Sequence, residues 1–200
     1  AEVFRNSPGH VALFAQSYAM LKQILEDDNW IPWGVRTEEE KTRMSKRDVG
    51  EMIQRLYQRR RTKDRVLICG VLSGKLAEGV DYPENILDAV ICVGLPVPPP
   101  SARQDALREY CKDKFGRDLA GRYSSHQPAV NSLLQAIGRP IRKAEDRALV
   151  VILEKRVLQR PYKFCVPDSL QVMKTPDSER TARLTKRFFE RFPDTAIEPS

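Results

Sequence analysis

Apolar residues gather in short unbroken runs along this chain. Three of them, residues 65–72, 88–95 and 147–153, contain hardly any polar positions, and residues 10–15 form a fourth run. A run without alternation is typical of a parallel strand that is buried on both faces. Residues 29–35 form a weaker strand candidate around Ile31 and Val35. The pattern therefore predicts a buried, mostly parallel sheet.

Between these runs the apolar residues recur three and four positions apart, which is helical spacing. Ser17 is placed to cap one such helix, and a second covers residues 45–61. Ser101 opens a third, which runs to about Phe115, and the last begins at Pro176 or Asp177. Helices alternating with buried strands predict an α/β fold with helices on both faces of the sheet.

The composition fits one domain, or one domain with a short appendage. The chain has 200 residues, 41% hydrophobic and 30% charged. It contains no apolar stretch long enough for a membrane span and does not begin like a signal peptide, so we expect an intracellular protein. Its four cysteines form no CxxC pair, so we expect no metal site. A net charge of +7 favours a polyanionic partner, but only weakly.

Residues 133–146, LLQAIGRPIRKAED, combine an apolar helical run with an amide and two guanidinium groups. Gln135 and Arg139 share a helix face, and Arg142 continues the stripe if the helix persists, although Pro140 should loosen or end it. A guanidinium is a rigid donor fork that stays charged, which suits polyphosphate. A helix whose arginines simply face water explains the pattern equally well.

A second candidate, residues 73–83 with the sequence SGKLAEGVDYP, directly follows a buried strand. Ligands of open α/β sheets bind beyond the carboxyl ends of the strands. Gly74 and Gly79 allow backbone conformations that other residues avoid, and Lys75 can contact a phosphate. Glu78 and Asp81 could accept hydrogen bonds from ribose or orient the arginines. An ordinary glycine-containing turn is the alternative, and no GxxxxGK[ST] phosphate loop occurs in the sequence.

These motifs occur in an order that resembles a known family. GHVALFAQSYAML is similar to helicase motif IV, GKLAEGVDYP to motif V and QAIGRPIR to motif VI. Over residues 9–157 the chain resembles the C-terminal RecA-like motor domain of the XPD/DinG group of superfamily 2 DNA helicases. The resemblance implies a RecA-like three-layer sandwich across residues 1–158, interrupted by an irregular, helical insertion at about 96–132. Residues 159–200 would form an extension packed on the same domain.

The resemblance also implies roles for individual residues. Arg139 and Arg142 would reach the phosphates of ATP, with Gln135 near the γ-phosphate or its attacking water. Gly79 and Asp81 would belong to the motif V loop, which links the nucleotide to the DNA. On the DNA side the resemblance places Ser17 and Tyr18 of motif IV, and we add Lys75 as a further candidate for contact with DNA.

The implied activity is ATP-driven 5′-to-3′ movement on single-stranded DNA, in repair or in unwinding linked to transcription. ATP and Mg²⁺ would be bound mainly by an N-terminal lobe absent from this sequence, and the family's iron–sulfur cluster would belong only to the full-length protein. We therefore expect a fragment that is inactive as an ATPase alone. Its expected partners are that lobe, single-stranded DNA and repair or transcription complexes. It would be cytoplasmic in a prokaryote and nuclear in a eukaryote. The alternative is a non-catalytic nucleic-acid or protein-binding module derived from a helicase lobe.

Overall fold

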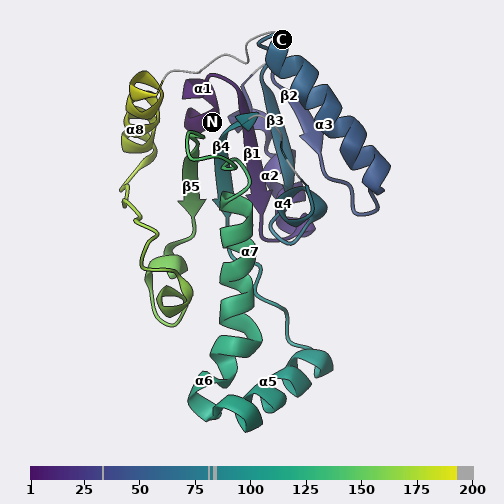
Figure 1. Cartoon of the computed structure of the whole chain (residues 1–200), viewed down its shortest axis with the longest axis vertical. Helices are drawn as coiled ribbons and strands as arrows, with labels where there is room; N and C mark the ends of the chain where they lie inside the picture. The colour runs from purple at the N-terminus through teal and green to yellow at the C-terminus, as the bar shows by residue number, and fades with distance from the viewer. Residues whose placement is uncertain (33, 81, 83–84, 193–200) are drawn as a thin grey trace.

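A parallel five-stranded sheet forms the centre of the computed structural model, which describes residues 1–32, 34–80, 82 and 85–192 (Figure 1). The strand order is β2-β3-β1-β4-β5, and every pair of neighbours is parallel. The strands are β1 (His10–Ala15), β2 (Arg36–Glu39), β3 (Val66–Val71), β4 (Leu87–Val93) and β5 (Leu149–Leu153). All carboxyl ends therefore lie at the same edge of the sheet.

Helices cover both faces of this sheet, which gives three layers. One face packs on α3 (Lys46–Arg61), α4 (Lys75–Glu78) and α7 (Gln127–Ile137), with Leu56 and Leu133 fully buried. The other packs on α1 (Glu2–Asn6) and α2 (Tyr18–Glu26). Alternate residues of β1 contribute to the two cores, Phe14 to the first and Leu13 to the second, because successive side chains of a strand point to opposite faces. The predicted α/β sandwich is confirmed.

Helix starts follow the predicted capping residues. Ser17 Oγ accepts a hydrogen bond from the Met20 amide, and Ser101 caps α5 (Ala102–Phe115) in the same way. At α3, Ser45 and Asp48 form a reciprocal capping box. The side chain of Asp177 accepts from an amide at the start of α8 (Ser178–Arg191). Each cap satisfies an amide that the helix leaves without an internal partner.

The strand expected at residues 29–35 is wrong. A short 3₁₀ helix, η1 (Asp28–Trp30), occupies its start, and the strand of this region is the polar β2 that follows. Trp30 packs against the second core and donates its indole N–H to the Ile24 carbonyl, 2.7 Å away. The apolar residues Trp30, Ile31 and Val35 pack against the second core without forming a strand. The strand β2 is polar because it lies at the edge of the sheet.

Two parts of the chain extend from the sandwich. A short helix, α6 (Arg117–Gly121), packs on α5, and together they project beyond the carboxyl edge of the sheet (Figure 1). A turn of π-helix, η3 (Arg122–His126), connects them to α7. After β5 come two 3₁₀ turns, η4 (Lys155–Leu158) and η5 (Tyr162–Cys165), and then α8, which contacts α1 at the opposite edge.

All four cysteines are free and buried, and Cys69 and Cys92 lie inside strands β3 and β4. Burial raises the pKa of both thiols to about 12. Over the described residues, the helices are all too short or too polar to cross a membrane.

Candidate functional site

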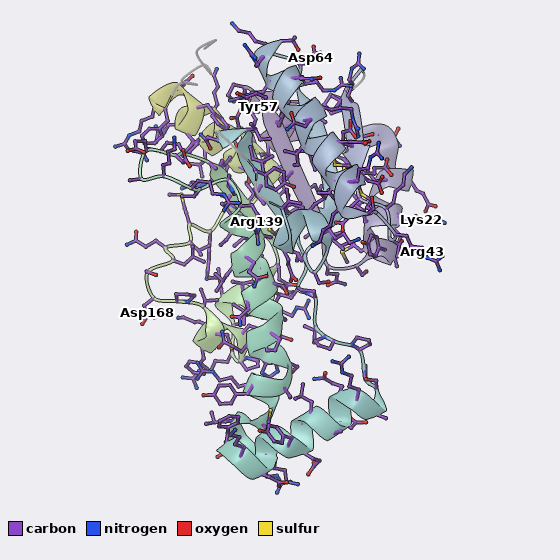
Figure 2. All side chains as sticks on the ribbon, turned by 45° about the vertical axis from the view of Figure 1, so that its right-hand side comes forward. Lys22, Arg43, Tyr57, Asp64, Arg139 and Asp168 are labelled. Carbon is purple, nitrogen blue, oxygen red and sulfur yellow. The ribbon has the colours of Figure 1, made fainter. Side chains whose placement is uncertain are left out.

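The two candidate motifs, residues 73–83 and 133–146, meet at the carboxyl edge of the sheet. The chain leaving β3 forms what we call the post-β3 loop, residues 73–80, which includes α4. The chain leaving α7 turns beside it, and α4 and α7 are in contact. Figure 2 shows Arg139 where the end of α7 approaches the sheet layer. Segments about sixty residues apart thus form one site.

Arg139 binds the post-β3 loop through three hydrogen bonds to main-chain carbonyls. Its Nε donates to Ala77 O at 2.5 Å, Nη1 to Val80 O at 3.0 Å and Nη2 to Glu78 O at 2.6 Å. A guanidinium carries five N–H groups. One N–H of Nη1 and one of Nη2 therefore stay available, so Arg139 can hold the loop and still donate to a ligand.

Gln135 precedes and Arg142 follows Arg139 along the chain. The helix ends at Ile137, before Pro140, so Gln135 lies on its last turn and Arg142 in the following loop. The stripe therefore does not continue as a helix. Both side chains are exposed, and Arg142 Nη2 donates a long bond of 3.4 Å to Val80 O. Arg142 thus reaches the same carbonyl as Arg139.

The glycines of the post-β3 loop leave room for neighbouring atoms that a side chain would displace. The prediction that they adopt unusual backbone angles is wrong. Gly74 has φ −92° and Gly79 φ −109°, values open to any residue. A Cβ on Gly74 would collide with the Glu40 carboxylate, and one on Gly79 would lie 3.2 Å from the Lys75 carbonyl. Nearby, Glu78 accepts a 2.8 Å hydrogen bond from Ser132 of α7, which adds a second link between the motifs. The candidate Asp81 lies outside the described residues.

The three residues expected to face DNA lie at this edge, and each has a structural contact. Ser17 uses its hydroxyl to cap α2. Tyr18 is 37% exposed and donates its hydroxyl to Glu40 Oε1 at 3.1 Å. Lys75 is exposed and donates from Nζ to the Met44 carbonyl. An ammonium has three N–H groups, so Lys75 also retains donors for a ligand.

Glu40 is the residue of this edge that the sequence did not reveal. It follows β2 in a run of charged residues, EEEK, and only its burial distinguishes it from Glu38 and Glu39, since it is 5% exposed. Its position after β2 brings it close to the ends of the other strands, but the polar sequence of β2 hides that position from the sequence alone. Burial, and then the Glu40 charge, raise the pKa of Tyr18 to about 12, so the phenol stays protonated and keeps donating.

The donor groups of this edge suit phosphate oxygens. Arg139, Arg142 and Lys75 provide cationic N–H groups, and Gln135 adds an amide. Within the part of the chain that the structure describes, no cluster of three or more His, Cys, Asp or Glu side chains could hold a metal ion. What the site offers is anion recognition through charge-assisted hydrogen bonds.

A comparison with protein families matches residues 1–173 to the helicase C-terminal domain. Among curated proteins, the ATP-dependent DNA helicase XPD of Sulfolobus acidocaldarius is 35% identical over 107 residues, which cover 52% of this chain and 19% of the relative. The Caenorhabditis elegans homologue of regulator of telomere elongation helicase 1 is 26% identical over 92% of this chain and 20% of its own length.

Solved structures give the same answer. An XPD helicase structure aligns with 87% of this chain and 30% of its own, at a TM-score of 0.63 and 26% identity. The chain spans at most about a fifth of the length of these curated relatives. Taken with the ordered motifs and the parallel sheet, these matches show that the chain belongs to the helicase C-terminal domain family, as the C-terminal helicase domain of an XPD/DinG-type helicase.

Proposed function

We propose that this domain is the second motor lobe of an ATP-dependent helicase that moves 5′ to 3′ on single-stranded DNA. In this proposal, ATP and Mg²⁺ bind mainly to an N-terminal lobe that carries the phosphate loop. Arg139 and Arg142 reach across to the terminal phosphates, and Gln135 lies near the γ-phosphate or its water. The domain alone hydrolyses no ATP, because half of the nucleotide site belongs to the other lobe.

The observation that carries this proposal is the geometry of Arg139. Three of its N–H groups hold the post-β3 loop and two remain, so one side chain both shapes the loop and presents charge at its surface. Positive charge fixed in advance is what stabilises a transferring phosphoryl group, since no reorganisation is then needed during the reaction. Gly79 and Glu78 belong to the same loop and would contact the nucleotide, as would Asp81 of the same sequence motif.

The proposed DNA contact lies along the same edge, at Ser17, Tyr18 and Lys75. It is independent of sequence, because ammonium, hydroxyl and aromatic groups contact phosphate and base faces without reading base edges. Binding weakens with salt, since each neutralised phosphate releases counterions. One lobe alone provides only part of the groove and so binds weakly.

The test is DNA-stimulated ATP hydrolysis by this chain joined to a matching N-terminal lobe, with Arg142→Ala and Arg139→Ala compared with the parent. Loss of an arginine that stabilises the transferring phosphate reduces turnover by about a thousandfold or more. Arg103→Ala is the control, because Arg103 is exposed on α5, outside this site. If single-strand binding survives while turnover collapses, the motor assignment stands. Normal hydrolysis by both variants refutes it and favours the binding-module alternative.

A further inference from the structure

Glu40 places a buried carboxylate between two segments of the candidate site. It directly follows β2, and its amide donates to the Cys69 carbonyl of β3 at 2.7 Å. This bond extends the β2–β3 pairing by one position and directs the chain across the carboxyl edge. Glu38 forms an ion pair with Arg55 at the surface, so the two carboxylates have different environments although they are two residues apart.

The carboxylate of Glu40 accepts hydrogen bonds from both segments. From the post-β3 loop, the Lys75 amide donates to Oε1 at 2.6 Å, and at the end of β3 the Val71 amide donates to Oε2 at 3.3 Å. From the start of α2, the Tyr18 hydroxyl donates to Oε1 at 3.1 Å. Three donors surround one side chain, which matches the acceptor-only, ionised form.

The surrounding chain is shaped to admit this side chain. A Cβ at Gly74 would overlap the carboxylate, and one at Gly70 would lie 2.8 Å from Oε2. Among the described residues, no cation forms an ion pair with Glu40, and the nearby Lys75 ammonium bonds to Met44 instead. Three hydrogen bonds, and no ion pair with a described residue, therefore hold the buried carboxylate, so its position depends on both segments staying in place.

We propose that Glu40 is a positioning residue that couples the Tyr18 segment to the post-β3 loop, so that DNA on one segment alters the nucleotide side of the other. The inference rests on the proposed function, in which Tyr18 faces DNA and the loop faces ATP. Glu40 contacts neither ligand in this scheme. A displacement of Tyr18 by DNA moves the carboxylate, and the carboxylate moves the Lys75 amide.

The first test compares Glu40→Gln with the parent in the full two-lobed helicase. Glutamine keeps the size of the glutamate side chain, but its NH₂ group replaces one carboxylate oxygen. One of the groups that donates to Glu40 would then face a second donor in place of an acceptor. We expect DNA stimulation of ATP hydrolysis to fall about tenfold, the scale of a typical coupling between sites, with turnover in the absence of DNA kept within about twofold. Glu38→Gln is the matched control and should leave stimulation unchanged.

Tyr18→Phe keeps the ring and removes only the hydroxyl that reaches Glu40, so it tests the link without emptying the buried site. If the link carries the signal, the double variant Tyr18→Phe with Glu40→Gln loses no more stimulation than Glu40→Gln alone. Losses that multiply in the double variant would overturn the proposal. If DNA stimulates ATP hydrolysis by Glu40→Gln as strongly as it does in the parent, the proposal is also overturned, and Glu40 serves only to stabilise the fold.

Failure of the proposed function gives a different pattern. In that case the parent enzyme itself shows no DNA-stimulated hydrolysis, or Arg142→Ala hydrolyses ATP as the parent does, and the coupling role falls with it. If instead Arg142→Ala abolishes turnover while Glu40→Gln is stimulated normally, only the coupling inference is wrong.

Discussion

Replacing Arg139 by glutamine should destabilise the folded domain as well as impair any chemistry. The guanidinium donates to the carbonyls of Ala77, Glu78 and Val80 at 2.5–3.0 Å, and the side chain is partly buried. Glutamine is shorter and carries no charge, so these carbonyls lose their donors. The predicted loss therefore belongs to the fold of the domain and can be measured without ATP.

The size of the effect follows from these bonds. A hydrogen bond to a charged group contributes about 1.5–3 kcal/mol, but the three bonds share one side chain and are not additive. The loop lies at the surface, so water can replace part of what is lost. We therefore expect Arg139→Gln to lower the free energy of unfolding by about 2–4 kcal/mol. Arg139→Lys keeps the charge but presents a point donor in place of a fork, and it should recover less than half of that.

Urea denaturation followed by circular dichroism measures this difference. The slope of the free energy against urea should stay the same, because the surface exposed on unfolding hardly changes. Arg103→Gln, an exposed position of α5, is the control and should lie within about 0.5 kcal/mol of the parent. If Arg139→Gln is as stable as that control, the three carbonyl bonds do not hold the loop and the reasoning fails.

Three further predictions concern buried groups away from the site. Both ring nitrogens of His10 are hydrogen-bonded, and burial is the main cause that lowers its pKa. As the pH drops below about 6.5, the free energy of unfolding should therefore decrease, by up to about 1.4 kcal/mol per pH unit. In urea unfolding measured at a series of pH values, His10→Gln should reduce this dependence. Asp88→Asn should cost about 3–5 kcal/mol in urea unfolding because it leaves the Arg60 charge buried, whereas Arg60→Met with Asp88→Leu should cost less than the single change. The thiols of Cys69 and Cys92 should react with a thiol reagent only after urea unfolding; fast labelling of the native protein would contradict their burial.

The sheet could be predicted from the sequence because burial on both faces leaves an unbroken apolar run. Four runs became β1, β3, β4 and β5 with ends shifted by at most two residues. The edge strand β2 could not be found in this way, because half of its surroundings are solvent and its sequence, RTEE, is polar. The apolar residues before it suggested a strand, yet they pack against the second core without forming one.

The members of the candidate site could be chosen from the sequence, but not their contacts. Arg139 was expected to face phosphate, and nothing in QAIGRPIR indicates that three of its donors bind the loop of the other motif. The basic cluster at the end of α3 shows the same limit. Arg60 lies there between two other arginines, yet it forms a buried ion pair with Asp88 that no local pattern predicts. Such contacts depend on which segments the topology brings together.

The post-β3 loop is held at both ends by residues of this chain. Glu40 accepts from the Lys75 amide at its start, and Arg139 donates to the carbonyls of Ala77, Glu78 and Val80 at its end. A loop fixed in this way needs no second lobe to take its shape, so little ordering cost remains when a ligand binds. Weak binding of ATP and DNA by the isolated domain would then reflect the missing half of each ligand site. Adding the second lobe should raise the affinity through new contacts. Hydrogen exchange of the backbone amides in residues 74–80 should stay unchanged.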